Sequence, residues 1–307
     1  KLLPQFPNNM FVIKYRKIFV SISAALVSLS IASMIFFGLN FGIDFKGGSL
    51  LEIEYANARP SQEVVQGIIK DLNVGEVLVQ PMGDNGYSFK MRDITDGERG
   101  QIMQALGSDA TEKSFTSIGP SVGAELVRKS IICFILVSLG IIFWIAFSFR
   151  KVSKPVSSWK YGLIAIISLV HDTIIAAGAF ALIGYLTGAE VDTLFVVAIL
   201  TTLGLSVSDT IVVFDRIREN IRIGHFKTFE ETVGRSLNQV FTRSIITSST
   251  VIMVLLSLVF WGPSSTRIFS IVLTIGMFFG TYSSIFLASP LLVMVNNIQA
   301  KSKKAKN

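Results

Sequence analysis

Six long apolar runs set the strongest limit on what this 307-residue chain can fold into. Half of its residues are hydrophobic, which is more than a soluble domain of this size carries. Each run approaches or exceeds the about 20 mostly apolar residues that a membrane-spanning helix needs. The sequence therefore predicts a multi-pass α-helical membrane protein with spans at 18–39, 131–149, 161–186, 193–214, 243–260 and 268–295. The first run is too long for a signal peptide and has no small-residue cleavage pattern, so we expect a retained anchor.

The distribution of charge between the runs predicts the topology. Residues 40–130 carry 9 basic and 13 acidic residues, whereas the whole chain carries 28 and 21. Basic residues gather instead in four other segments, which the positive-inside rule places in the cytoplasm. An even number of spans then puts both termini inside, with 1–17, the loop 215–242 and the tail 296–307 cytoplasmic and 40–130 outside. The four clusters are Lys14, Arg16 and Lys17; Arg150, Lys151, Lys154 and Lys160; Arg216, Arg218, Arg222, Lys227 and Arg235; and Lys301, Lys303, Lys304 and Lys306.

The pattern between the first two spans is that of a small α+β domain. Strand-like segments at 49–55, 76–80, 87–92 and 112–117 alternate with helix-like segments at 61–72 and 95–106. A Gly-Asp-Asn-Gly turn at 83–86 joins the second strand to the third. The order β-α-β-β-α-β predicts a ferredoxin-like extracytoplasmic domain. The charged segment 215–242 fits either a solvated helical extension or a docking surface for a partner.

An acidic residue within an apolar run points to chemistry inside the membrane. Asp209 lies in the fourth run, and Arg243 begins the fifth. A charge at the centre of a membrane helix costs about 2.5–3.5 kcal/mol on insertion scales, so such groups usually have a function. Helical spacing aligns Ser206 with Asp209 and Thr247 with Arg243. We expect an acid–base pair that holds and releases a proton; in the alternative, Arg243 reaches the headgroups and Asp209 only bonds Ser206.

Other polar and small residues in the spans are secondary candidates. His171 and Asp172, near the middle of the third run, are either a second titratable site or hydrogen-bonding groups between helices. In the sixth run, Gly276, Gly280 and Ser284 recur every four residues, which predicts close helix packing.

Nothing in the sequence indicates an enzyme. It has no phosphate-binding loop, no HExxH motif, and no Ser or Cys nucleophile beside a plausible base. Cys133 is the only cysteine, which excludes an internal disulfide and a cysteine-based metal site. We expect no metal, no cofactor apart from H⁺ as a coupling ion, and no nucleic-acid partner. Moving one charge through 100 mV of membrane potential yields about 2.3 kcal/mol, which is a usable energy source.

Four longer motifs stand out in the sequence: FGIDFKGGS at 41–49, IGPSVGAEL at 118–126, SVSDTIVVFDRIREN at 206–220 and TRSIITSS at 242–249. They resemble motifs of the SecD/SecF family of accessory subunits of the bacterial Sec translocon, and the single outer domain is similar to that of its SecF-type members. The resemblance covers nearly the whole chain. It implies one half of a resistance–nodulation–division (RND) type fold, with Asp209 and Arg243 on the proton path.

The resemblance also implies a function and partners. It implies a proton-motive-force-driven subunit that assists protein translocation across the bacterial inner membrane. The implied partners are SecD, the SecYEG channel and the unfolded polypeptide, with YajC and YidC as further candidates. Two alternatives remain open at this point: a small-molecule efflux subunit of the RND type, or a passive scaffold of the translocon.

Overall fold

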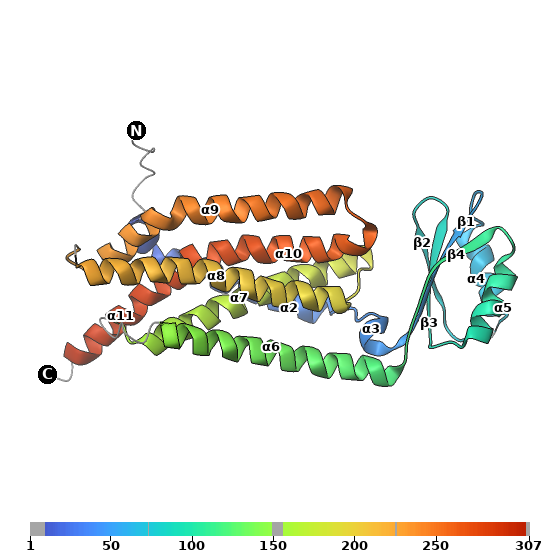
Figure 1. The fold of residues 1–307 in the computed structure, drawn as a ribbon, viewed down its shortest axis with the longest axis horizontal. Helices are drawn as coiled ribbons and strands as arrows, with labels where there is room; N and C mark the ends of the chain where they lie inside the picture. The colour runs from blue at the N-terminus through green and yellow to red at the C-terminus, as the bar shows by residue number, and fades with distance from the viewer. Residues whose placement is uncertain (1–9, 73, 149–155, 225, 305–307) are drawn as a thin grey trace. The chain divides into compact units, whose positions relative to one another are not determined.

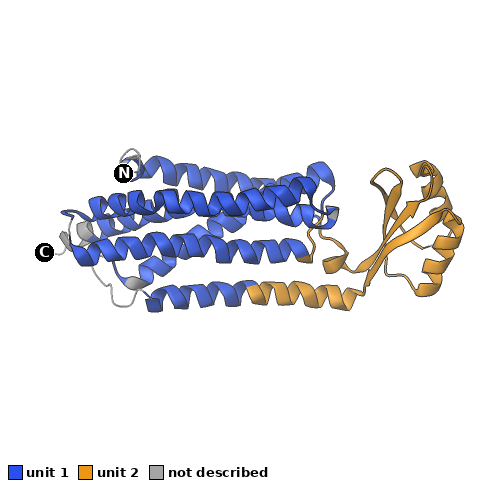
Figure 2. Cartoon of the chain, turned by 45° about the horizontal axis from the view of Figure 1, so that its top comes forward, with its two compact units in different colours: residues 1–40, 134–189, 194–307 blue, residues 41–133, 190–193 orange. Residues whose placement is uncertain are grey.

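The chain forms two compact units (Figure 2). The structure is a computed structural model that describes residues 10–72, 74–148, 156–224 and 226–304. The first unit comprises residues 1–40, 134–189 and 194–307, and the second comprises residues 41–133 and 190–193. Arg150, Lys151, Lys154 and Lys306 of the predicted cytoplasmic clusters lie outside the described residues.

Helices make up the first unit, and the prediction of six spans is confirmed. Six stretches in the described part of the chain are long and apolar enough to cross a membrane. Five of them are single helices, and the sixth joins α10, a π-helical turn η1 and α11 (Figure 1). The helices are α1 (Met10–Lys14), α2 (Arg16–Phe37), α6 (Pro120–Ser148), α7 (Ser158–Thr187), α8 (Thr193–Ile223), α9 (Phe229–Trp261), α10 (Ser264–Ser283), η1 (Ser284–Ala288) and α11 (Ser289–Lys304). Helix α6 belongs to the first unit from residue 134 onward, and its residues up to 133 belong to the second unit (Figure 2).

Residues 215–242, the predicted cytoplasmic loop between two spans, are mostly helical, which agrees with the helical extension that the sequence allowed. Helix α8 continues to Ile223, and α9 begins at Phe229, well before its apolar run. The Thr228 side chain caps α9 by accepting a hydrogen bond from the Glu231 backbone N–H at 3.1 Å. Asn220 Nδ2 donates to Ser236 Oγ at 2.8 Å, which joins the two extensions. Capping and this cross-link explain why the chain stays helical beyond the hydrophobic segments.

The helices of the first unit differ in how much of their surface is buried. In their most apolar windows, 56% of the α7 residues and 61% of those in the last span are buried, against 6% for α6 and 11% for α2. Helix α6 exposes large side chains such as Phe143 and Trp144. A soluble helix would not expose a continuous apolar surface, so α6 and α2 have the composition of helices that face lipid or another membrane helix.

The second unit confirms the predicted ferredoxin-like order. Its four-stranded sheet runs β2-β3-β1-β4, and every neighbouring pair is antiparallel. Its own core includes Leu51, Val65, Phe89 and Ile102, all fully buried. The elements are α3 (Ile43–Lys46), β1 (Gly48–Tyr55), α4 (Gln62–Lys70), β2 (Leu78–Met82), β3 (Gly86–Met91), α5 (Asp96–Leu106) and β4 (Ala110–Ile118) (Figure 1).

Helix α5 begins with a capping box formed by Thr95 and Glu98. Thr95 accepts from the Glu98 backbone N–H, while the Glu98 carboxylate accepts from the Thr95 backbone N–H. Arg92 also donates to Glu98. The Arg92 hydrogen bond, followed by the Thr95 backbone bond, lowers the pKa of Glu98 from its ordinary 4.5 to about 2.

The second unit also includes four residues that are distant in sequence, 190–193. The Gly42 backbone N–H donates to Val191 O at 2.8 Å, and Phe41 pairs with Val191 in a short parallel bridge. Asp44 accepts from both the backbone N–H and the hydroxyl of Thr193. Sequence analysis did not predict these contacts, because they join segments about 150 residues apart.

Candidate functional site

Asp172 of α7 is enclosed by polar groups at the centre of the first unit. The residue is fully buried. Its Oδ2 accepts from Ser206 Oγ of α8 at 2.5 Å and from Ser283 Oγ of α10 at 2.8 Å. Its Oδ1 lies 2.8 Å from His171 Nδ1. Three helices therefore supply the groups that hold one buried carboxyl group.

Asp209 of α8 has a similar environment with fewer donors. Its Oδ1 accepts from Ser244 Oγ of α9 at 2.7 Å, and its Oδ2 accepts from Ser284 Oγ of η1 at 2.6 Å. The residue is half-buried. Serine hydroxyls can donate to a carboxylate and accept from a protonated carboxyl group, so this arrangement accommodates both protonation states.

Arg243 does not form the expected ion pair with Asp209. Among the described residues, no basic nitrogen lies within 4.0 Å of the Asp209 carboxylate, and Arg243 is exposed on α9. The reason is helical phase, since consecutive residues are about 100° apart around a helix. Ser244 faces α8, so Arg243 points elsewhere. Thr247 is exposed on the same side of α9 as Arg243.

The alternative expected for Asp209, a bond to Ser206, is not observed either. Ser206 donates to Asp172 instead. The side of α9 that faces the acid carries Ser244 and Ser248, one helical turn apart. Ser248 accepts from Thr281 of α10 at 2.6 Å, which extends the polar contacts between α9 and α10.

Two glycines of α10 lie against α8. A β-carbon added at Gly276 would be 2.3 Å from Thr202 Oγ1, and one added at Gly280 would be 2.9 Å from Ser206 Cβ. The absence of side chains lets α10 approach the face of α8 that carries Ser206. This close approach brings Ser283 and Ser284 within reach of the two acids.

His171 has one nitrogen that the site does not use. Its Nε2 is buried and makes no hydrogen bond to the described residues. It borders a groove of about 400 Å³ lined mainly by apolar side chains of α2 and α7, such as Val27 and Ile174. The ring also stacks on Tyr282 of α10 at 6.3 Å between centroids.

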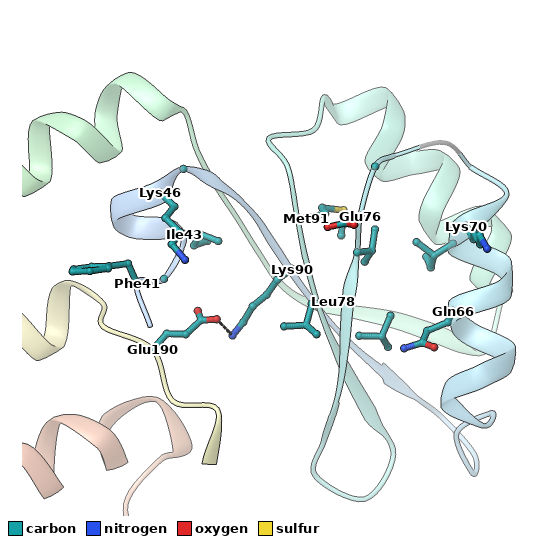
Figure 3. A pocket seen from close by; sticks show the side chains of 16 residues that line it. Phe41, Ile43, Lys46, Gln66, Lys70, Glu76, Leu78, Lys90, Met91 and Glu190 are labelled. Carbon is teal, nitrogen blue, oxygen red and sulfur yellow. Dashed lines mark ion pairs between the residues drawn. The ribbon is translucent and has the colours of Figure 1, made fainter. Parts of the chain in front are cut away.

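A separate hollow of about 810 Å³ lies within the second unit (Figure 3). Phe41 and Ile43 lie on one side of it, and Gln66 and Lys70 of α4 lie on the other. Between them, Lys90 Nζ and Glu190 Oε1 form an ion pair at 2.9 Å. No group of three or more His, Cys, Asp or Glu side chains suited to a metal occurs in the described part of the chain.

Both acids were predicted from the sequence, but most of the residues that hold them were not. Ser283 and Ser244 were not singled out, and Ser284 was predicted only as a packing residue. Their positions in the sequence could have indicated a polar contact between helices. Ser244 and Ser248 are four residues apart, and Ser283 and Ser284 are adjacent in an apolar run. Spacing alone does not show which of several polar stripes faces a neighbouring helix.

Six spanning helices, a ferredoxin-like domain between the first two, and acids inside the bundle define the class as an RND-type membrane protein. The solved structures agree. The crystal structure of SecDF, a translocon-associated membrane protein from Thermus thermophilus, is 29% identical with a TM-score of 0.82 over 97% of this chain. SecDF in a super-membrane-facing form is 27% identical with a TM-score of 0.71 over the whole chain. This chain spans only 40% and 41% of the length of those two proteins.

Sequence comparisons identify the family. Residues 98–298 match the C-terminal model of the protein export membrane proteins SecD/SecF, and residues 32–58 match the SecD/SecF GG motif. The protein translocase subunit SecF of Thermobaculum terrenum is 40% identical over 93% of this chain and 94% of its own length. That of Anaerolinea thermophila is 37% identical over 91% and 92%. The chain therefore belongs to the SecD/SecF family of protein export membrane proteins.

Proposed function

We propose that this chain is the SecF-type subunit of a complex with SecD that uses the proton-motive force to assist protein translocation. The names of its relatives support a role in translocation. Similarity to 40% of a SecDF chain supports a partner that supplies the remaining part. In this proposal the complex lies in the bacterial inner membrane beside SecYEG, with both termini of this chain cytoplasmic and H⁺ as the coupling ion. YajC and YidC are further candidate partners.

The observation that carries the proposal is the pair of carboxyl groups held by hydroxyls of several helices. Asp172 and Asp209 lie on neighbouring helices, and neither has a Lys or Arg partner within the described residues. A lone carboxylate in a low-dielectric bundle is expensive, whereas its protonated form is not. Proton uptake therefore changes the hydrogen bonds between helices, and α8 can shift against α9 and η1 as a result.

The exposed side of α9 supports the partnership with SecD. Arg243, Thr247 and Thr250 are exposed at spacings of four and three residues, so they share one face of the helix. Polar groups facing lipid are unfavourable, and membrane helices usually turn them toward another protein surface. We propose that SecD covers this face, and that Arg243 acts on the proton path across that interface.

Export assays on the full complex test the proposal. Asp209→Asn removes the titratable group but keeps its size, so the ionophore-sensitive part of export should fall to the level measured without the subunit. Arg243→Met should have the same effect. Both variants should still copurify with SecD. Asp215→Asn is the matched control, because Asp215 lies on the same helix, is exposed, and its one ion pair with the described residues is with Arg218 at 3.6 Å. Full activity of Asp209→Asn and Arg243→Met would refute proton coupling through this chain.

The same assays separate the two alternatives. A passive scaffold would retain ionophore-sensitive export in Asp209→Asn whenever the complex assembles. An efflux subunit would transport small molecules in vesicles and copurify without a SecD-like partner.

A further inference from the structure

Ser283 and Ser284 are adjacent residues that bind two different acids. We call them the serine pair. Ser283 Oγ donates to Asp172 Oδ2 at 2.8 Å, and Ser284 Oγ donates to Asp209 Oδ2 at 2.6 Å. Both serines are fully buried. Consecutive helical side chains point about 100° apart, so one short segment reaches both α7 and α8.

Each hydroxyl of the serine pair has a second acceptor within its own helix. Ser283 Oγ lies 3.1 Å from Gly280 O, and Ser284 Oγ lies 3.0 Å from Thr281 O. A hydroxyl has a single proton, so it makes its strong bond to one acceptor at a time. Beside an ionised carboxylate, the proton points to the carboxylate. Beside a protonated carboxyl group, the serine oxygen can accept the carboxyl proton while its own proton turns to the backbone carbonyl.

The backbone at the serine pair is locally irregular. The α-helix α10 ends at Ser283, and the π-helical turn η1 begins at Ser284. Ser289 Oγ donates to Ser284 O at 3.2 Å, five residues back. π-Helices occur mostly as single turns within α-helices, and such turns are frequent at functional sites. Such a turn can change its hydrogen-bond register locally without unfolding the helix on either side.

The other hydrogen-bonding side chains around the two acids lie on three different helices. Asp172 also meets His171, which stacks on Tyr282 of α10, and the neutral Ser206 of α8. Asp209 meets the neutral Ser244 of α9, and no basic nitrogen lies within 4.0 Å of it among the described residues. Among the described residues, the serine pair is the one segment whose side chains donate to both acids. Helix α8 carries Asp209 itself and reaches Asp172 through Ser206, so the test must separate these two routes.

We propose that the serine pair couples the protonation of Asp172 to that of Asp209. A proton that binds Asp209 Oδ2 reverses its hydrogen bond with Ser284 Oγ, and the Ser284 proton turns to Thr281 O. Ser283 is the next residue on the same backbone. The change at Ser284 therefore moves the Ser283 hydroxyl, which donates a hydrogen bond to Asp172. The chain would then hold two linked proton sites, with Ser283 and Ser284 as positioning residues. This inference rests on the proposed function, since it assumes that Asp209 takes up a proton.

Infrared difference spectroscopy of the full complex in lipid tests the coupling. The Asp172 carboxyl band is assigned by its loss in Asp172→Asn, and its titration midpoint is then compared with and without Asp209→Asn. In the otherwise native chain, the midpoint should move by about one pH unit, the size expected for interacting sites. In the Ser283→Ala/Ser284→Ala background, Asp209→Asn should leave the midpoint where it is.

Two further variants separate coupling from a simple loss of structure. Ser270→Ala removes a fully buried hydroxyl of α10 whose one hydrogen bond to the described residues goes to Thr266 O of its own helix, and it should preserve the shift. Ser283→Thr/Ser284→Thr keeps both hydroxyls and should also preserve it. A shift that persists in the double alanine variant would overturn the inference, as would an Asp172 midpoint insensitive to Asp209→Asn in the native background. Loss of export in Asp209→Asn would at the same time leave the proposed function standing.

Discussion

Asp172 and Asp209 differ in how completely the bundle encloses them. Asp172 is fully buried with three polar neighbours, whereas Asp209 is half-buried with two. In the proposed path, Asp209 is the more accessible of the two proton sites of this chain, and Asp172 is the enclosed one.

In the second unit, Glu98 makes stability depend on pH. Its folded pKa of about 2 lies below its ordinary 4.5, so its contribution is present above pH 4.5 and is lost as the pH falls toward 2. Glu98→Gln should lack this contribution at every pH. We therefore expect amides of α5 to exchange hydrogen faster in Glu98→Gln than in the native chain at neutral pH, and the difference to shrink as the pH falls below 4.5.

Mass spectrometry of hydrogen exchange in the full protein measures this difference. Glu63→Gln is the matched control, because Glu63 lies in the first turn of α4 and makes no ion pair with the described residues. The difference in exchange rate between Glu98→Gln and the native chain should be smaller near pH 2 than at neutral pH. An equally large difference at both pH values would contradict the pH-dependent contribution of Glu98.

At the scale of elements, the crossing of α2 and α7 depends on a glycine that the sequence did not mark. A β-carbon added at Gly178 of α7 would lie 2.4 Å from Ser30 Cβ and 2.6 Å from Ser30 Cα on α2. Ser33 Oγ of α2 donates to Gly178 O at 2.8 Å. The obstacle includes backbone, which cannot rotate away. Any larger residue at position 178 must separate the two helices.

Gly178→Ala should therefore destabilise the protein by about 1–3 kcal/mol, the usual cost of overpacking. Thermal unfolding of the purified complex, followed by tryptophan fluorescence, measures the change. Gly204→Ala on α8 is the control, because a β-carbon there meets nothing within 4 Å. It should leave stability unchanged or raise it by up to about 1 kcal/mol through helix propensity. Equal melting temperatures for Gly178→Ala and the native chain would refute this account of the crossing.

At the scale of the whole molecule, the two units have separate hydrophobic cores. The core of the second unit runs from Leu51 to Ala110 and uses no residue of the first unit. Four paired strands with two helices on one hydrophobic face exceed the minimum for an independently stable sheet. Many domains of about 55–65 residues fold alone.

Residues 48–118 expressed alone should therefore form a soluble domain that unfolds in one cooperative thermal transition by circular dichroism. Phe89→Ser, which puts a hydroxyl in the centre of the core, should abolish the transition. Lys113→Gln is the control, since the one ion pair that Lys113 forms with the described residues, to Glu54, is exposed. A disordered fragment would show that this sheet depends on the rest of the chain.

Sequence alone was sufficient where the signal is local. The six spans follow from the length of the apolar runs, and the ferredoxin-like order follows from short alternating patterns and the turn at 83–86. Thr95 and Glu98 form the cap that a Thr-x-x-Glu pattern indicates. The charge of Asp209 within an apolar run also marked it as a functional candidate without any coordinates.

Only the tertiary structure decided which side chains meet. The fifth span contains two polar stripes one residue apart, and the difference of about 100° between them determines whether Arg243 or Ser244 faces Asp209. Sequence periodicity gives the angle between two stripes but not the rotation of a helix against its neighbours. That rotation depends on packing contacts such as Gly276 against Thr202, between residues far apart in the chain. The chain therefore encodes its spans and its acids locally, whereas the hydrogen bonds that join Asp172 and Asp209 exist only once the helices have packed.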